Sequence, residues 1–220
     1  MIYLFSGTPG SGKSLHQARL VYNWVNVLNN PCICNYPINI EMISESRRKN
    51  FIYVDNEELT PEFLMKFSRQ YFKGKKFKEG KIRVFIDEAQ LLFNAREWDI
   101  KGRKEWTAFF TQHRKFGYDI YLIAQFDRML DRQLRSLIEY EIVHRKISNF
   151  GWFGKLLSLV VMGKLFVSVL VWYPLKEKIS SEFFVYRPKW SKFYDTYKNF
   201  NDDEEDEDEK EDSVSVDCGG

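Results

Sequence analysis

The segment GTPGSGKS, residues 7–14, constrains this 220-residue chain more than any other part of its sequence. Four apolar or aromatic residues, Ile2 to Phe5, come before it and are typical of a short buried strand. After it, apolar residues recur at the three- and four-residue spacing of an amphipathic helix: Leu15, Ala18, Val21, Tyr22 and Val25. The sequence therefore predicts a strand, a glycine-rich turn and a helix, in that order.

The same segment matches G-x-x-x-x-G-K-[ST], the pattern of a phosphate-binding P-loop. Its glycines allow successive backbone N–H groups to point at phosphate oxygens, and the N-terminal end of the following helix adds partial positive charge. We expect Lys13 to reach the β- and γ-phosphates of ATP, and the Ser14 hydroxyl to bind Mg²⁺. The predicted nucleotide-binding residues of the loop are Gly7, Thr8, Pro9, Gly10, Ser11, Gly12, Lys13 and Ser14.

A second segment, RVFIDEAQ, supplies two carboxylates at the end of an apolar strand. We expect Asp87 to hold Mg²⁺ through water, as the aspartate of a Walker B motif does. Glu88 is the candidate to orient or deprotonate the attacking water, which would make the chain a hydrolase. The alternative is that Glu88 is only a solvated charge at a strand end.

Three further residues are weaker candidates for catalysis. Gln125 ends the next apolar strand, IYLIAQ, where an amide could contact the γ-phosphate or the attacking water. Arg114 and Arg135 are candidates for an arginine finger, which is given to a neighbouring subunit and stabilises the transition state. The alternatives are an ordinary strand-end amide and ordinary surface arginines.

Strands alternate with helices along most of the chain, and the strands are apolar throughout their length. This pattern predicts an α/β fold of the P-loop NTPase class, with a mostly parallel sheet flanked by helices. The hydrophobic segment 155–175 is long enough to span a bilayer, but Gly163 and Lys164 interrupt it. A β-hairpin turning at residues 162–164 explains the interruption better, so we expect a C-terminal hairpin extension and not a membrane span.

Charge divides the chain into a basic body and an acidic tail. Residues 1–201 hold 32 basic and 20 acidic residues, a net charge of +12, whereas residues 202–220 carry −10. We expect a folded domain over residues 1–200 and a disordered acidic tail over 201–220. The basic body could meet nucleic acid or an anionic membrane surface, or simply be soluble. Three cysteines are too few for a disulfide framework, which favours a reducing, cytoplasmic location.

Several motifs together resemble one family. They are the early P-loop, CNYPI, IDEAQ, HRKFGYDIYLIAQ, DRQLRSLIEYEI and FYDTY, in this order over roughly residues 1–197. This set resembles the zonular occludens toxin (Zot) domain, which is shared with filamentous-phage morphogenesis proteins and is similar to the FtsK/HerA branch of P-loop motors. The resemblance implies a cytoplasmic ATPase, peripheral to the bacterial inner membrane, that drives phage assembly and extrusion. It also implies single-stranded phage DNA or a DNA–coat complex, inner-membrane assembly proteins and further copies of the chain as partners.

The sequence departs from that family in one respect. Relatives usually carry a transmembrane helix after the ATPase domain, whereas here FYDTY runs into the acidic tail. Attachment to the membrane would then come from a partner or from segment 155–175, or the chain is a truncated relative. The toxin activity behind the family's name belongs to regions beyond the ATPase domain.

Other functions remain open on the sequence alone. They are a DNA translocase or packaging ATPase of the FtsK/HerA type, a small-molecule kinase, and a nucleotide switch that scaffolds a membrane complex without hydrolysis. A kinase would need an acceptor pocket and an arginine-rich lid, for which no segment stands out. Glu88 separates a hydrolase from a switch, because only hydrolysis depends on it.

Overall fold

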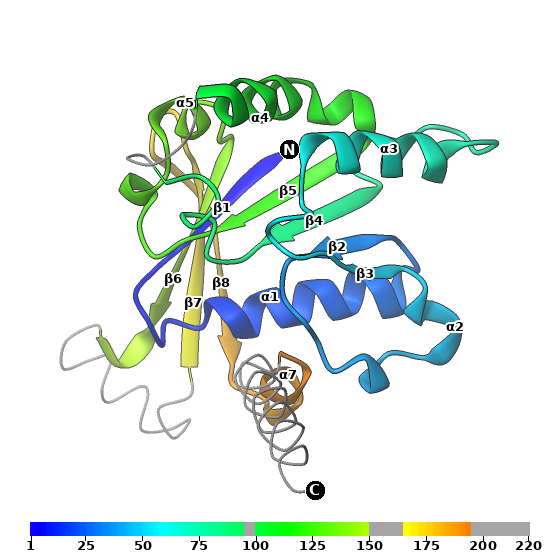
Figure 1. Cartoon of the computed structure of the whole chain (residues 1–220). Helices are drawn as coiled ribbons and strands as arrows, with labels where there is room; N and C mark the ends of the chain where they lie inside the picture. The colour runs from blue at the N-terminus through cyan, green and yellow to red at the C-terminus, as the bar shows by residue number, and fades with distance from the viewer. Residues whose placement is uncertain (95–99, 150–164, 195–220) are drawn as a thin grey trace, which may run out of the picture.

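The computed structural model describes residues 1–94, 100–149 and 165–194. In these residues eight strands form one sheet in the order β3-β2-β4-β5-β1-β6-β7-β8 (Figure 1). The strands are β1 (Ile2–Ser6), β2 (Cys32–Cys34), β3 (Phe51–Tyr53), β4 (Ile82–Ile86), β5 (Tyr118–Ile123), β6 (Tyr140–Lys146), β7 (Leu165–Trp172) and β8 (Glu177–Val185).

Helices occupy most of the connections between the strands. The α-helices are α1 (Lys13–Tyr22), α2 (Glu45–Arg48), α3 (Pro61–Phe72), α4 (Ile100–Gln112), α5 (Arg132–Arg135) and α7 (Pro188–Phe193). A π-helical turn, η1 (Asn23–Val27), extends α1, and the 3₁₀ turns are η2 (Ile40–Met42), η3 (His113–Phe116), η4 (Asp127–Met129) and η5 (Ile147–Asn149). The predicted helix after the P-loop is present as α1, and Thr60 caps α3 by accepting a hydrogen bond from the Phe63 N–H.

Six strands that are neighbours in the sheet, in the order β3-β2-β4-β5-β1-β6, are parallel. This agrees with the prediction made from their apolar sequences. β1 lies between β5 and β6, and β5 separates it from β4. Because parallel strands end at the same edge of a sheet, the residues that follow β1, β5 and β4 meet at that edge. This edge therefore carries the P-loop and the carboxylates after β4.

Side chains alternate between two hydrophobic cores, one on each face of the sheet. Leu4 and Val84 belong to the core under α3, α4 and α5, whereas their neighbours Phe5 and Phe85 belong to the core under α1 and α7. All four side chains are fully buried. Figure 1 shows the two helical layers on opposite sides of the sheet, with α1 alongside α7. Burial on both faces explains why these strands are apolar along their whole length.

A C-terminal β-hairpin, formed by β7 and β8, extends the sheet beyond the parallel strands. β7 pairs antiparallel with β6 and with β8, and the turn between β7 and β8 falls at residues 173–176. The turn expected at residues 162–164 lies outside the described residues. The second half of the hydrophobic segment 155–175 is thus a sheet strand. Over the described ranges, no helix is long and apolar enough to cross a bilayer.

Two buried histidines join the P-loop helix to the sheet. The Nδ1 of His16 in α1 lies 2.8 Å from the Nε2 of His144 in β6, and His144 Nδ1 lies 3.3 Å from the Ser6 carbonyl oxygen. Because that carbonyl can only accept, His144 donates from Nδ1 and accepts the His16 N–H at Nε2. Burial lowers the pKa of both imidazoles, that of His144 to about 4, and the neighbouring cations Arg19 and Lys13 act in the same direction.

The histidine pair predicts a loss of stability in mild acid. Below a pH of about 6.5 the unfolded chain binds protons at both imidazoles, whereas the folded chain does not until the pH nears its depressed pKa values. The free energy of unfolding should therefore fall as the pH drops from 7 to 5, by up to about 1.4 kcal/mol per pH unit for each histidine. Urea titrations at pH 7, 6 and 5 measure this slope.

A His16→Gln/His144→Gln double variant is the control, because glutamine amides can keep neutral hydrogen bonds without titrating. Its unfolding free energy should depend less on pH than that of the wild type. His113 is present in both proteins, so its protonation cancels in the comparison. Equal pH slopes would contradict the assignment of a neutral buried pair.

Candidate functional site

The P-loop joins β1 to α1 in a backbone conformation that requires glycine. Gly7, Gly10 and Gly12 have φ angles of 141°, 72° and 93°, which side chains rarely allow. A Cβ at Gly7 would lie 2.5 Å from the carbonyl oxygen of His144, and one at Gly12 would lie 2.8 Å from the ring of Phe166. The loop thus packs tightly against β6 and β7, and its conformation is imposed by the fold.

The loop also contains a buried hydroxyl that suits a phosphate ligand. Ser11 is 2% exposed, and its Oγ has no hydrogen-bond partner within the described ranges. A buried polar atom of this kind normally finds a partner, because leaving it unpaired costs about 1–3 kcal/mol. Pro9 and Gly10 are exposed at the tip of the loop, as is Thr8.

Lys13 begins α1 and folds back over the loop. Its Nζ donates to the Gly7 carbonyl oxygen at 2.5 Å and lies 3.4 Å from that of Thr8. Burial lowers the pKa of Lys13, and the negative charges of Glu88 and Asp87 oppose this shift. The ammonium of the P-loop and the two carboxylates therefore lie close enough to act on one another.

Asp87 directly follows β4 and is held at both its backbone and its side chain. The Asn35 side chain accepts the Asp87 N–H at 2.7 Å and donates to the Asp87 carbonyl oxygen at 2.9 Å. The carboxylate accepts the Glu88 N–H at Oδ1, at 2.9 Å, and the hydroxyl of Tyr194 at Oδ2. Burial raises the pKa of Asp87, while the two hydrogen bonds and the charge of Lys13 lower it.

Glu88 adopts an unusual backbone conformation for a residue with a side chain. Its φ angle is 44°, in the left-handed region, which costs of order 1–3 kcal/mol for such residues and is enriched at functional sites. The side chain is exposed, and its Oε2 accepts a hydrogen bond from the Gln90 amide. The turn at Glu88 follows the end of β4 and leaves an exposed carboxylate next to Asp87 in the sequence.

Gln125 lies between the P-loop and the carboxylates, because β5 separates β1 from β4. Its carbonyl oxygen accepts the Gly7 N–H at 3.2 Å, so its backbone closes the start of the P-loop. Its side chain is half-buried and lines a cavity of about 450 Å³ together with Gly7 and Thr8. The structure thus brings the loop, the two carboxylates and Gln125 to one edge of the sheet.

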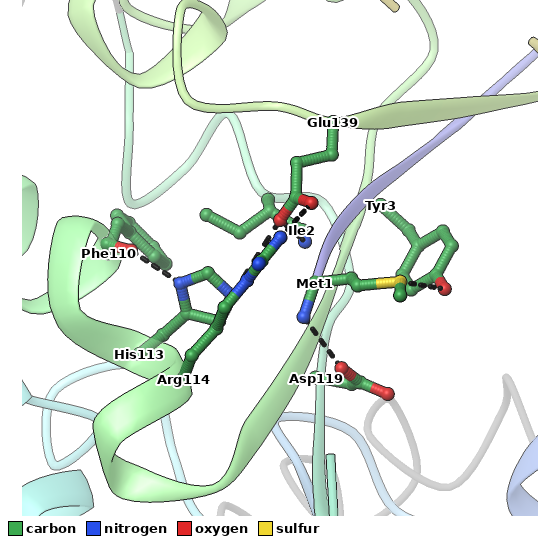
Figure 2. A network of polar contacts seen from close by, with 8 residues as sticks. All are labelled: Met1, Ile2, Tyr3, Phe110, His113, Arg114, Asp119 and Glu139. Carbon is green, nitrogen blue, oxygen red and sulfur yellow. Dashed lines mark hydrogen bonds and ion pairs between the residues drawn. The ribbon is translucent and has the colours of Figure 1, made fainter. Parts of the chain in front are cut away.

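The two candidate arginines lie elsewhere in this chain. Arg114 in η3 pairs with Glu139, which also accepts the Ile2 N–H at 3.2 Å, at the beginning of β1 (Figure 2). Arg114 is therefore at the opposite edge of the sheet from the P-loop of its own chain. Arg135 ends α5, where its charge acts on Tyr173. A role for either arginine at the site of a neighbouring subunit stays a prediction.

The donor set suits Mg²⁺, although no described group of three or more His, Cys, Asp or Glu side chains could hold a metal. Mg²⁺ usually keeps several waters and is bound by one or two carboxylates together with substrate phosphates. The Ser14 hydroxyl is exposed at the start of α1. Asp87 accepts one hydrogen bond at each carboxylate oxygen and keeps lone pairs for water. Ser14 and Asp87 therefore fit a magnesium–nucleotide complex.

Sequence reasoning missed three features of this site. Asn35 and Tyr194 contact Asp87 from positions 52 and 107 residues away, and the left-handed turn at Glu88 had no glycine to signal it. The quoted motifs CNYPI and FYDTY contain Asn35 and Tyr194, which was the available signal. A single sequence gave no reason to place either residue beside the Walker B aspartate.

Known proteins match both the sequence and the fold. The profile of the family described as "Zonular occludens toxin (Zot)" matches residues 1–181. The "Gene 1 protein" of Enterobacteria phage I2-2 is 32% identical over 85 residues, which cover 37% of this chain and 23% of that protein. The match thus spans about a quarter of the length of that phage relative.

Solved structures show the same fold at low sequence identity. The N-terminal domain of zonular occludens toxin from Neisseria meningitidis superposes with a TM-score of 0.53 and 20% identity, covering 88% of this chain and 98% of that chain. The genome packaging NTPase B204 of Sulfolobus turreted icosahedral virus 2, in complex with AMPPCP, gives 0.52 and 15%, covering 83% and 95%. These likenesses confirm the predicted P-loop NTPase fold. Since the profile covers most of its residues, the chain belongs to the zonular occludens toxin (Zot) family.

Proposed function

We propose that this chain is an ATPase domain that hydrolyses ATP to drive assembly and extrusion of a filamentous phage at the bacterial inner membrane. The observation that carries the proposal is that the P-loop lysine and the carboxylates after β4 lie at the same edge of the sheet. The charges of Glu88 and Asp87 act on Lys13, and those of Glu88 and Lys13 act on Asp87, at the edge where the glycine loop would receive phosphate.

Each residue of the site has a role in this proposal. The P-loop backbone from Gly7 to Ser14 binds the phosphates, and Lys13 leaves the Gly7 carbonyl oxygen to meet the β- and γ-phosphates. Ser14 and Asp87 hold Mg²⁺, which when bound neutralises charge on the phosphate oxygens. Glu88 orients and deprotonates the attacking water, and Gln125 contacts the γ-phosphate or that water.

The phage context rests on relatives and charge. The chain matches phage Gene 1 proteins, and residues 1–201 carry a net charge of +12. Such a body attracts a polyanion, and we propose single-stranded phage DNA or its coat complex as cargo. We further propose that the chain works as a homo-oligomer in the cytoplasm, docked on inner-membrane assembly proteins. A packaging role of the B204 kind would use the same site on another cargo.

Lys13→Ala tests the phosphate site. Removing the ammonium that meets the β- and γ-phosphates should lower ATP turnover by about 100-fold or more, while far-UV circular dichroism and the melting temperature stay close to wild type. Lys115→Ala, which removes an exposed lysine from η3, is the matched control and should keep its activity. Normal turnover by Lys13→Ala would show that the phosphate site is misassigned.

The same assay tests the cargo. Single-stranded DNA at low salt should raise the ATP turnover of the wild type and leave that of Lys13→Ala unchanged. The effect should weaken as salt is added, because phosphate contacts release counterions. If single-stranded DNA leaves the ATP turnover rate unchanged at every salt concentration, DNA is not the cargo, and the ATPase assignment still stands.

Glu88→Gln separates a hydrolase from a nucleotide switch. The amide keeps the shape of the side chain but cannot accept a proton from water, so turnover should fall by about 10²–10⁴-fold. The affinity for ATP, measured by calorimetry, should change little. Glu79→Gln, another exposed glutamate, serves as the control. A Glu88→Gln protein that turns ATP over at the wild-type rate would favour the switch.

A further inference from the structure

Tyr194 reaches the Walker B aspartate from the last described part of the chain. It follows α7 directly, and its hydroxyl donates a hydrogen bond to Asp87 Oδ2. Its ring packs against Tyr36, with centroids 5.0 Å apart. The two tyrosine rings therefore pack together beside the Asp87 carboxylate. Nothing in the proposed mechanism above uses this contact.

The position of Tyr194 is fixed by the docking of α7 on the core. Phe193 is fully buried, and its carbonyl oxygen accepts the Asn39 N–H at 2.9 Å. The rings of Trp190 and Phe193 meet Tyr22 of α1 edge-on, at centroid distances of 5.4 and 5.6 Å. Because α1 begins with the P-loop lysine, α7 packs on the same helix that presents Lys13 and Ser14 (Figure 1).

The hydroxyl of Tyr194 restrains the rotation of the Asp87 carboxylate, which the backbone contacts of Asp87 leave free. Asn35 clamps the Asp87 backbone at its N–H and its carbonyl oxygen, but the terminal torsion of an aspartate is broad and weakly restrained. Two donors fix this torsion in Asp87: the Glu88 N–H bonds to Oδ1, and the Tyr194 hydroxyl bonds to Oδ2. Each oxygen has two lone pairs, so one remains on each for a water bound to a metal.

The tyrosine remains a donor across the physiological range. Burial raises the pKa of its hydroxyl well above the ordinary value, and the charge of Asp87 adds to this shift. The hydrogen bond therefore stays O–H to carboxylate, a charge-assisted contact that is stronger than one between neutral groups.

We propose that Tyr194 is a positioning residue for the magnesium site: its hydroxyl fixes the Asp87 carboxylate in the orientation that accepts metal-bound water, so that the docking of α7 on α1 sets the affinity for Mg²⁺. This inference rests on the proposed nucleotide site. It assigns a role in metal binding to α7 and Tyr194, which follow β8. If the hydroxyl instead obstructed the metal, removing it would lower the Mg²⁺ concentration that nucleotide binding requires.

The test is the Mg²⁺ dependence of nucleotide binding in Tyr194→Phe. The dissociation constant of a non-hydrolysable ATP analogue is measured by calorimetry over a Mg²⁺ titration and in EDTA. Contacts that orient metal ligands typically change metal affinity 10–100-fold, and since Asp87 acts through water we expect about tenfold more Mg²⁺ to be required. Binding in EDTA should not change, because the phosphates meet the P-loop and not Asp87.

Tyr36→Phe is the matched control, because its hydroxyl is buried in the same ring pair but makes no hydrogen bond to the Asp87 carboxylate, whose described donors are the Glu88 N–H and the Tyr194 hydroxyl. Its Mg²⁺ dependence should equal that of the wild type. Trp190→Ala retains the Tyr194 hydroxyl but removes a ring that packs α7 on Tyr22, so the hydroxyl should be held less firmly against Asp87 and the Mg²⁺ requirement should rise as well. Combined with Tyr194→Phe, it should add little, because both changes act through one contact.

An unchanged Mg²⁺ requirement in Tyr194→Phe would overturn the inference, and so would a lower one, which would mean that the hydroxyl obstructs the metal. In both cases wild-type binding of the magnesium–nucleotide complex would leave the proposed ATPase site standing. A wild type that binds no nucleotide at any Mg²⁺ concentration would overturn both proposals. Melting curves of all variants show that each compared protein is folded.

Discussion

The insertion of β5 between β1 and β4 is the constraint on which the site depends. Parallel pairing of these three strands places the P-loop, Gln125 and Asp87 side by side at one edge, although they lie up to 118 residues apart in the sequence. The hydrogen bond from the Gly7 N–H to the Gln125 carbonyl oxygen joins the loop to the end of β5. The pairings of β1 with β5 and of β5 with β4 therefore place the P-loop ammonium near the carboxylates.

Contacts from beyond the three central strands β4, β5 and β1 also hold this edge. β6 and β7 meet the loop so closely that a single Cβ at Gly7 or Gly12 would clash with them, and the His16–His144 pair fastens α1 to β6. On the other side Asn35 fixes the backbone of Asp87. The loop and the aspartate are therefore pre-organised by packing and hydrogen bonds, which is the condition for strong electrostatic stabilisation.

The sequence alone predicted the elements whose signals are local. The P-loop, the apolar strands and the carboxylates after β4 follow from neighbouring residues, and the structure shows the strand, turn and helix expected at residues 2–22. Contacts between distant residues were not predictable. Arg114 carries the same charge in any position, and only the fold shows that it pairs with Glu139 at the opposite edge. Tyr194 and the later turn of the hairpin depend in the same way on which segments pack together.

The most direct measurement of this account is a structure of the chain bound to Mg²⁺ and a non-hydrolysable ATP analogue. We expect the triphosphate within the loop of residues 7–14, with Lys13 Nζ moved from the Gly7 carbonyl oxygen to the β- and γ-phosphates. We also expect the metal on the Ser14 hydroxyl, with a water between the metal and Asp87. A triphosphate bound elsewhere, or a metal remote from Asp87 and Glu88, would contradict it.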